Sequence, residues 1–381
     1  MRLLNLTTSS KWPTLRLGEA IELVYGKSLP KNVRVEGTIP VYGSNGIAGW
    51  HNTPSVNGPT IIVGRKGSAG AVQLVEEPCC PIDTTYFVRV REGFRFELRF
   101  LFYLLRKLDL SRLKTATGVP GLTREDAYQE QIPVPPFDEQ RRIVDILSRA
   151  EGIIRLRREA QKKAAELIPA LFLDMFGDPA MNPKGRPIFR LGDIAEVVSG
   201  VTKGRKFNGK QTVTAPYLRV ANVQAGFLDL TELKEIEVLP SDVQQLTLQY
   251  GDVLLTEGGD YDKLGRGALW IYDIPRCIHQ NHIFRVRLEK DFALPEFFVT
   301  YLQTQHARNY FLRSAKQTTN LASINMTQLR GLPVILPPVD TQSTFVKLFE
   351  QIHSIKTEQE NATQKAEATF NALLARAFLM Q

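Results

Sequence analysis

The sequence predicts an α+β protein of two mixed α/β domains with mostly β cores, separated by two long antiparallel coiled-coil helices and related by an internal pseudo-twofold repeat. Three observations predict this fold class. Short motifs recur in the same order in both halves of the 381-residue chain. Each half begins with short alternating runs of Val, Ile and aromatic residues between glycines, a pattern typical of strands. Each half ends in a long segment whose apolar residues repeat about every 3.5 positions, which is typical of coiled coils.

Short motifs recur along the chain in a fixed order. The sequence LRLGE at residues 15–19 returns as FRLGD at residues 189–193, and PPFDEQ at residues 135–140 returns as PPVDTQ at residues 337–342. Single residues align in the same order, namely Pro78, Cys80, Phe87, Leu105 and Phe172 with Pro275, Cys277, Phe284, Leu302 and Phe378. Because the order is kept and the spacing grows only by small insertions, we infer an internal duplication.

Each copy begins with a segment that is predicted to form strands and then a helix. Alternating apolar runs bounded by glycine turns predict the strands. The predicted strands are residues 60–63 and 86–90 in the first copy, and residues 252–256 and 283–288 in the second. An amphipathic segment then predicts a helix, at residues 98–108 in the first copy and 295–312 in the second.

A proline-rich stop precedes the long helical segment of each copy. The prolines of IPVPPF and LPVILPP cannot continue a helix or a central strand. Asp138 and Asp340 are predicted to cap the helices that follow, and Pro169 is expected to kink the first one. The seam positions are Ile143, Leu147, Ala150, Ile154, Arg157, Gln161, Ala164, Ile168, Leu171 and Met175 in the first helix, and Phe345, Phe349, Ile352, Lys356, Gln359, Thr363, Ala366, Phe370, Leu373, Ala377 and Met380 in the second.

The duplication also predicts how the helices pair and where the domains end. A pseudo-twofold axis perpendicular to the two helices makes them antiparallel. At about 1.5 Å of rise per residue, each helix would be about 60 Å long. The predicted boundaries are a first domain at residues 1–137, a central helix at 138–176, a second domain at 177–340 and a distal helix at 341–381.

Composition narrows the class of protein. A hydrophobic fraction of 43% with 23% charged residues is typical of a globular chain, and a net charge of +8 favours a polyanionic partner. No apolar run approaches the ~20 residues that span a bilayer, and MRLLNLTTSSKWP lacks the core of a signal peptide, so we expect no membrane contact and a cytoplasmic location. Cys79, Cys80, Cys277 and the histidines show no ligand spacing, so no metal site is expected.

Motifs that suggest an enzyme each lack a required feature. IELVYGKS at residues 21–28 ends like a phosphate loop, but Ile21 stands where the first glycine must be. VPPF at residues 134–137 is similar to the PP-aromatic element of adenine amino-methyltransferases, yet Val134 cannot accept a hydrogen bond from a target amine. GRKGSAG at residues 64–70 lacks GxGxxG spacing and predicts a hairpin turn with two cations. No catalytic residue is therefore assigned, and we expect a recognition protein rather than an enzyme.

The duplicated architecture resembles the specificity (S) subunit of type I restriction–modification systems. The first copy ends in an [IL]PxPP-x-[DE]-x-Q element and a long helix, and the second copy has the PP-x-[DE]-x-Q part of this element before its own long helix. The resemblance spans essentially the whole chain. Its strongest marks are PPFDEQRRIVDIL and ALFLDMFGDP in the first copy and PPVDTQSTFVKLF in the second. Thr341 replaces the usual acidic residue in the second copy.

The resemblance implies a DNA-binding protein with no cofactor of its own. Each target-recognition domain would read one half of a split sequence in double-stranded DNA, and the helices would set the distance between the halves. Two methyltransferase (M) subunits would dock on the helices, and restriction/translocase (R) subunits would join them. S-adenosylmethionine, ATP and magnesium would belong to those partners. One alternative is a coiled-coil scaffold that binds proteins through both globular domains. Another is a methyltransferase–specificity fusion, which the missing cofactor loop disfavours.

Polar turns and nearby cations are the candidate DNA contacts. Side chains on loops read bases, while Lys and Arg hold phosphates. In the first domain, the candidates lie in and near VYGSNG and VGRKGSAG, namely Lys27, Tyr42, Ser44, Asn45, Arg65, Lys66 and Ser68. In the second domain, they are Lys203, Arg205, Lys206, Arg219, Asn222, Lys263, Arg266, Gln280 and Asn281.

Overall fold

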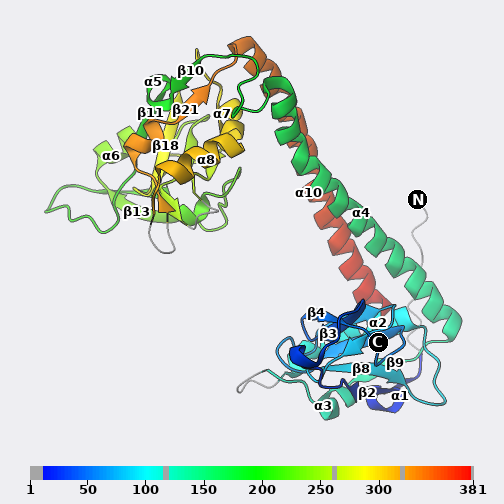
Figure 1. Cartoon of the computed structure of the whole chain (residues 1–381). Helices are drawn as coiled ribbons and strands as arrows, with labels where there is room; N and C mark the ends of the chain where they lie inside the picture. Colours follow the sequence, from blue (N-terminus) through cyan, green and yellow to red (C-terminus); the bar gives the residue numbers. More distant parts are fainter. Residues whose placement is uncertain (1–11, 115–119, 260–263, 318–321, 379–381) are drawn as a thin grey trace, which may run out of the picture. The chain divides into compact units, whose positions relative to one another are not determined.

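The structure is a computed structural model that describes residues 12–114, 120–259, 264–317 and 322–378. The chain divides into two compact units, of which unit 1 comprises residues 1–158 and 361–381 and unit 2 comprises residues 159–360 (Figure 1). Among the described helices, none combines the length and the apolar character that crossing a bilayer requires.

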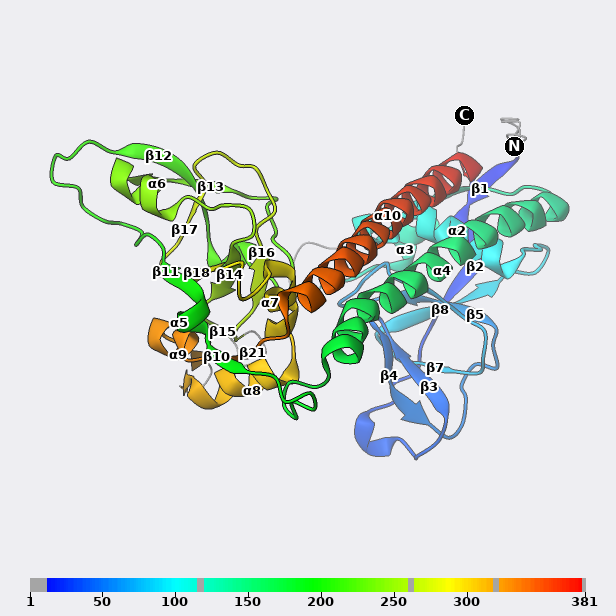
Figure 2. The same ribbon diagram turned by 90° about the horizontal axis from the view of Figure 1, so that it is seen from above.

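The described part of unit 1 is built on a four-stranded sheet of order β2-β8-β5-β6. These strands are β2 (Ile21–Tyr25), β8 (Thr85–Val90), β5 (Thr60–Gly64) and β6 (Val72–Val75). A three-stranded sheet, β4 (Gly46–His51), β3 (Ile39–Gly43) and β7 (Cys80–Pro81), lies to one side of it (Figure 2). β1 (Thr14–Arg16) pairs with β9 (Gln131–Pro133), and the short helices are α1 (Leu17–Ala20), η1 (Lys31–Val33), η2 (Leu110–Leu113) and α3 (Arg124–Tyr128).

Helix α2 (Leu98–Leu108) supplies much of the core of unit 1, as its amphipathic sequence predicts. The carboxylate of Glu97 accepts a hydrogen bond from the backbone N–H of Phe100 at 2.7 Å and so caps the helix. Phe100 and Tyr103 are buried and contact the rings of Phe378 and Phe370 at centroid distances of 5.3 and 6.2 Å. The end of the distal helix is therefore part of the core of unit 1.

The described part of unit 2 repeats this arrangement with additions. Its four-stranded sheet has the order β11 (Ala195–Ser199), β18 (Ile283–Leu288), β14 (Val253–Thr256), β16 (Gly267–Leu269). Its three-stranded sheets are β13 (Lys234–Val238), β12 (Val213–Leu218), β17 (Ile278–His279), and β15 (Gly258–Gly259), β20 (Ala322–Ser323), β19 (Lys316–Gln317). β10 (Ile188–Arg190) pairs with β21 (Pro333–Ile335), and the shorter helices are α5 (Leu191–Ile194), η3 (Val220–Asn222), α6 (Pro240–Leu246) and α9 (Met326–Arg330).

The structure confirms the duplication and the predicted strands, and it divides one predicted helix. The order β2-β8-β5-β6 in unit 1 is matched by β11-β18-β14-β16 in unit 2, and the parallel pair β3·β7 is matched by β12·β17. The helix predicted at residues 295–312 is instead two helices, α7 (Pro295–Leu302) and α8 (Gln305–Ser314). The hydroxyl of Thr304 caps α8 by accepting from the backbone N–H of Ala307, and this cap starts a new helix.

Strand registers correct the alignment of the repeats by one residue. β8 and β18 are each six residues long and pair with β2 and β11 in the same register. This register makes Tyr86, not Phe87, the equivalent of Phe284; both Tyr86 and Phe284 are buried in the cores of their units. Phe87 is on the other face of its strand, at the position of Arg285, because side chains alternate along a strand and a shift of one residue reverses the face.

The same shift applies to the cysteines. The parallel pairings of β7 with β3 and of β17 with β12 make Cys79, not Cys80, the equivalent of Cys277. Cys79 is buried in a cluster with Ile62, and Cys277 is buried in a cluster with Leu254. Each thiol fills the same position between the two sheets of its unit, and burial raises the pKa of both thiols.

The long helices α4 (Phe137–Phe176) and α10 (Val339–Ala377) pack together, and each contributes one half to each unit. In unit 1, Arg158 of α4 forms a salt bridge with Glu367 of α10 at 2.6 Å. In unit 2, the side chain of Gln161 donates to the carbonyl of Gln359 at 3.4 Å. Also in unit 2, the ring centre of Phe172 lies 5.8 Å from that of Phe345. The contact position on α10 therefore falls as the position on α4 rises, so the helices are antiparallel, as predicted (Figure 1 and Figure 2).

Helix starts differ slightly from the prediction. α4 begins at Phe137 and α10 at Val339, so Asp138 and Asp340 lie inside the first turns rather than at the caps. There a carboxylate still interacts favourably with the positive end of the helix dipole. α4 remains continuous through Pro169 to Phe176, because an exposed proline removes one backbone hydrogen bond without ending a helix that is packed on a partner.

Candidate nucleic-acid interface

In unit 1, two polar turns meet at one end of the sheets. Ser44 and Asn45 form the turn between β3 and β4, and residues 65–71 form the turn between β5 and β6. The Ser68 hydroxyl donates to the side-chain oxygen of Asn45 at 3.4 Å, which ties the turns together. Gly64 is required at the start of the second turn, because a Cβ there would lie 2.1 Å from the Ser68 carbonyl oxygen. The predicted hairpin at residues 64–70 is confirmed.

The cations of unit 1 are attached to the same end of the sheets. The backbone N–H groups of Arg65 and Lys66 both donate to the carbonyl of Thr84, at 2.8 and 3.2 Å, and the N–H of Lys27 donates to the carbonyl of Pro81 at 3.0 Å. Lys27 and Lys66 are exposed. The structure therefore brings Lys27, Arg65 and Lys66 into one loop cluster, together with the turn residues Ser44, Asn45 and Ser68.

Tyr42 has a different environment from the other candidates in unit 1. Its ring packs against the buried cluster of Ile62, Val75 and Cys79. Burial raises the pKa of its hydroxyl, with a further contribution from Cys79. Tyr42 therefore supports the sheet beneath the turn, since its ring fills a hydrophobic position.

Two residues of this loop cluster were missed by the sequence analysis. The ring of Tyr25, at the end of β2, is 43% exposed. The guanidinium carbon of Arg65 lies 5.2 Å from the centre of this ring, and that of Arg124 lies 4.5 Å from it. Such distances are typical of cation–π contacts. Tyr25 and Arg124 are far apart in sequence, so no local pattern could have joined them.

In unit 2, the loops that follow β11 and β12 and the segment between β17 and β18 converge. The backbone N–H of Asn281 donates to the carbonyl of Val201, and that of Gln280 donates to the carbonyl of Leu218, both at 2.9 Å. Gln280 and Asn281 are half-buried and lie next to the start of the loop that carries Arg219. Gln280 and Asn281 therefore lie where these loops meet.

Arg219 and Asn222 hold a long loop that replaces the two-residue turn of unit 1. Asn222 is 3% exposed, accepts from the backbone N–H of Arg219 at 2.8 Å and donates to the carbonyls of Asp229 and Glu232. Arg219 forms a salt bridge with Glu232 at 2.9 Å, which lowers the pKa of that carboxyl, and Lys234 lowers it further. The Asn222 amide is fully engaged inside the protein, so its role here is structural.

The remaining candidates in unit 2 are on separate segments. Lys203, Arg205 and Lys206 are exposed on the loop between β11 and β12, where Arg205 pairs with Asp242 at 3.1 Å. Arg266 donates to the side-chain oxygen of Gln224 at 3.1 Å, beside η3. Lys263 lies outside the described residues. Arg266 thus joins the converging loops, whereas residues 203–206 extend from them.

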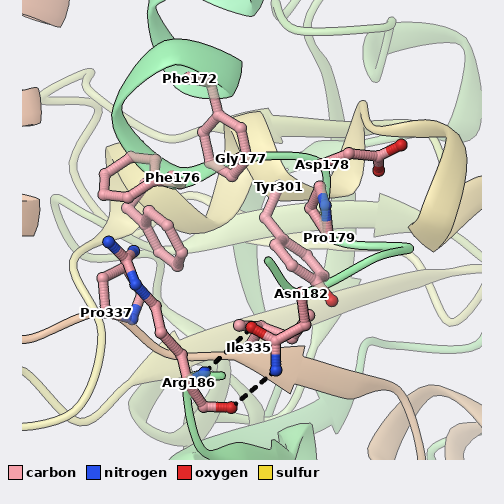
Figure 3. Close-up of a pocket in the computed structure, with 11 residues that line it drawn as sticks. Phe172, Phe176, Gly177, Asp178, Pro179, Asn182, Arg186, Tyr301, Ile335 and Pro337 are labelled. Carbon is pink, nitrogen blue, oxygen red and sulfur yellow. Dashed lines mark hydrogen bonds between the residues drawn. The ribbon is translucent and has the colours of Figure 1, made fainter. Parts of the chain in front are cut away.

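A small aromatic pocket forms where α4 ends in unit 2 (Figure 3). Phe172, Phe176 and Tyr301 line it, and its volume of about 10 Å³ would hold one water molecule. The Asn182 side chain binds both backbone groups of Arg186, at 2.9 and 3.0 Å, and the guanidinium of Arg186 lies 5.3 Å from the ring centre of Phe176. The pocket is too small for a cofactor. The contacts of Asn182 and Arg186 around it hold the turn that follows α4.

Comparison with known proteins shows the family of the chain. Residues 9–166 and 183–369 both match the model of the type I restriction modification DNA specificity domain, and the chain belongs to this family of specificity subunits. The EcoKI specificity subunit of Escherichia coli K12 is 26% identical over 293 residues, which cover 71% of this chain and 61% of that protein. The MjaVIII specificity subunit of Methanocaldococcus jannaschii is 24% identical over 97% of this chain and 93% of its own.

The fold is also similar to that of solved specificity subunits. The S subunit of a type I restriction–modification system from M. genitalium superposes with a TM-score of 0.61 at 16% identity, covering 99% of this chain and 98% of its own. A chain from a study of the assembly of a type I restriction–modification system has the same TM-score at 19% identity. The duplicated fold is therefore that of this family.

Proposed function

We propose that this chain is the DNA-reading subunit of a type I restriction–modification complex, in which each unit reads one half of a bipartite target. The observation that carries this proposal is that the two units share the positions of their converging loops but differ in the length and side chains of those loops. The converging loops occupy equivalent places in both units, but a two-residue turn at Ser44 and Asn45 in unit 1 corresponds to residues 219–233 in unit 2. Equivalent scaffolds with unlike loops suit two unlike half-sites.

The antiparallel helices are proposed to set the spacing of the half-sites and to dock two methyltransferase subunits, which restriction/translocase subunits then join. Support for docking comes from apolar side chains that the helix pair leaves in solvent. Ile153 and Leu156 of α4 are 50% and 58% exposed, and Leu167 and Leu173 are 47% and 49% exposed. Ile153 and Leu156 are three residues apart and so adjoin on the helix surface, and adjoining exposed apolar side chains are typical of a surface that another protein covers.

The chain itself is proposed to carry no chemistry. In the described residues, no group of His, Cys, Asp and Glu is arranged to hold a metal ion. Methylation with S-adenosylmethionine, and ATP- and magnesium-dependent cleavage, would belong to the partner subunits, in the cytoplasm. The candidate contacts on both units would bind double-stranded DNA, with exposed lysines on phosphates and amides and guanidiniums on base edges.

A methylation assay with a domain exchange tests this function. The chain is purified with its matching methyltransferase subunit, and methylated adenines are mapped in a random DNA library. We expect methylation at one split sequence. Replacing residues 12–134 with those of a relative should change one half only, because β1 and β9 pair at Thr14 and Pro133 and so close this segment on itself. A chimera that changes both halves would contradict independent reading, and protein binding without any DNA specificity would favour a scaffold.

A further inference from the structure

A cluster of Tyr25, Arg65 and Arg124 differs from the other arginine sites of the chain. Several other arginines of unit 1 are neutralised by carboxylates, as in Arg89 with Glu22 at 3.2 Å and Arg106 with Glu151 at 3.1 Å. In the described part of unit 1, neither Arg65 nor Arg124 forms a salt bridge, although both guanidiniums contact one exposed ring. Two like charges beside one another raise the local positive potential, and a ligand with acceptor atoms would relieve their repulsion.

The orientation of both guanidiniums is fixed by the fold. The Nε atoms of Arg65 and Arg124 are buried and make no hydrogen bond in the structure. The backbone around Arg65 is held on both sides, because its N–H donates to Thr84 and its carbonyl accepts from Leu122 at 2.9 Å. With their central carbons over the Tyr25 ring and their Nε atoms covered, the guanidiniums have only their terminal N–H groups available for a ligand. Such a preorganised pair of donors suits two acceptors in one plane.

Unit 2 has no such cluster at the equivalent positions. The strand registers make Ser199 the equivalent of Tyr25 and Glu257 the equivalent of Arg65. Met326 opens α9 as Arg124 opens α3. There the Ser199 hydroxyl donates to a backbone carbonyl at 2.7 Å, and Glu257 lies 2.6 Å from the Nδ1 atom of His282.

The contrast between the units argues against a purely structural role for the cluster. The same backbone is built in unit 2 without two arginines or an aromatic ring, so the fold does not require them. Lys66, next to Arg65, is exposed and free of salt bridges in the described residues, and its flexible ammonium group suits phosphate. The fixed donors of Arg65 and Arg124 suit the O6 and N7 acceptors of guanine, which lie together in the major groove.

Resting on the proposed function, we propose that Arg65 and Arg124, positioned by Tyr25, recognise a guanine in the half-site that unit 1 reads. Unit 2 has Glu257, a hydrogen-bond acceptor, in place of Arg65, so we do not expect unit 2 to recognise a guanine in this way. Tyr25 is a positioning residue, since it orients the two donors without offering a base contact of its own.

The test measures base preference and salt dependence separately. The complex with the methyltransferase subunit is assayed on a library randomised at the unit 1 half-site. We expect a guanine there, and Arg65→Lys or Arg124→Lys should lower the preference for it by about tenfold or more, because lysine keeps the charge but loses the planar pair of donors. The salt slope of binding should stay unchanged. Tyr25→Leu should reduce the same preference, whereas Tyr25→Phe, which keeps the ring, should not.

Two matched controls give the opposite pattern. Lys66→Gln should weaken binding to all sequences alike and flatten the salt slope by about one unit, as loss of one phosphate contact does. Glu257→Gln should alter only the half-site read by unit 2. A unit 1 half-site without guanine, or a uniform loss of affinity in Arg65→Lys and Arg124→Lys, would overturn the proposal while leaving the proposed function intact. If the wild-type complex methylates no split sequence, the proposed function itself fails.

Discussion

Gln140 and Gln342 make the same three hydrogen bonds in their respective units. The side-chain oxygen of Gln140 accepts from the backbone N–H of Glu97 at 2.8 Å, and its amide donates to the carbonyls of Arg95 and Pro135. Gln342 accepts and donates in the same way, to Leu294, Phe292 and Pro337, each at 2.9 Å. The glutamine of the repeated PPxxxQ element thus fastens the start of each long helix to the segment before α2 or α7.

Replacing either glutamine by alanine should lower the stability of its unit. Both side chains are buried, at 1% and 0% exposure, so the change leaves a backbone N–H and two carbonyls without their partner. We expect Gln140→Ala and Gln342→Ala each to lower the free energy of unfolding by about 2–3 kcal/mol. Gln351→Ala, on an exposed site of α10, is the control and should change it by less than about 0.5 kcal/mol. Urea unfolding measures the difference, and equal midpoints for Gln140→Ala and Gln351→Ala would contradict the assigned role.

His279 should make the stability of unit 2 depend on pH. It is fully buried, its Nδ1 atom lies 3.0 Å from the carbonyl oxygen of Ile283, and its Nε2 atom has no partner in the structure. Burial lowers the pKa of His279 to about 4. Between its ordinary value near 6.5 and about 4, the unfolded chain binds a proton that the folded chain does not. The stability that neutral His279 contributes is therefore complete above about pH 6.5. It is lost as the pH falls toward 4, by at most about 1.4 kcal/mol for each pH unit.

A variant that lacks only His279 isolates this effect. His279→Gln should unfold with a smaller loss of stability between pH 7 and pH 5 than the wild type does. The comparison uses urea unfolding of both proteins at each pH, followed by a signal from unit 2 such as the fluorescence of the buried Trp270. Parallel losses in the two proteins would show that His279 takes up its proton equally in the folded and unfolded states.

Lengthening both helices by one heptad should lengthen the DNA spacer. Seven residues inserted between Arg158 and Glu159, and seven between Glu360 and Asn361, fall at the division between the units and keep the seam in phase. They add about 10 Å of rise, since each helical residue adds about 1.5 Å. That length equals about three base pairs of B-DNA at ~3.4 Å each. If the helices set the spacing, the variant should keep both half-sites and prefer a spacer about three base pairs longer.

The activity of this variant should also fall. Whole heptads keep the rotation of one unit about the helix pair unchanged. Three added base pairs, in contrast, rotate the second half-site about the DNA axis by about 100°, at ~10.5 base pairs per turn. The spacer preference is measured by methylation of a library of spacer lengths. The control has the heptad in α4 alone and should lose activity, because the seam is then out of register. A folded, active double insertion that keeps the original spacer would rule out the helices as the ruler.

Local patterns predicted much of the architecture and part of the interface. The duplication, the strands and the antiparallel helix pair follow from motif order and apolar periodicity, which neighbouring residues carry by themselves. The turn at residues 64–70 was predicted correctly because its glycines and cations are consecutive. Lys27 and Lys66 are exposed in one loop cluster, while Tyr42 and Asn222 proved to be built into the fold, since hydrogen-bond partners and burial depend on distant segments.

The sequence by itself determined that the chain contains an internal duplication, and that each copy ends in a long segment with apolar residues at coiled-coil spacing. Only the tertiary structure decided which side chains each face of a strand presents. The strand registers shift the alignment of the repeats by one residue, so that Tyr86 is the equivalent of Phe284 and Phe87 lies on the opposite face of its strand. Tertiary structure alone also brought Arg65 and Arg124 to the ring of Tyr25. The physical reason is that periodicity is a property of neighbouring residues, whereas strand register and side-chain clusters arise when segments far apart in the chain pack together.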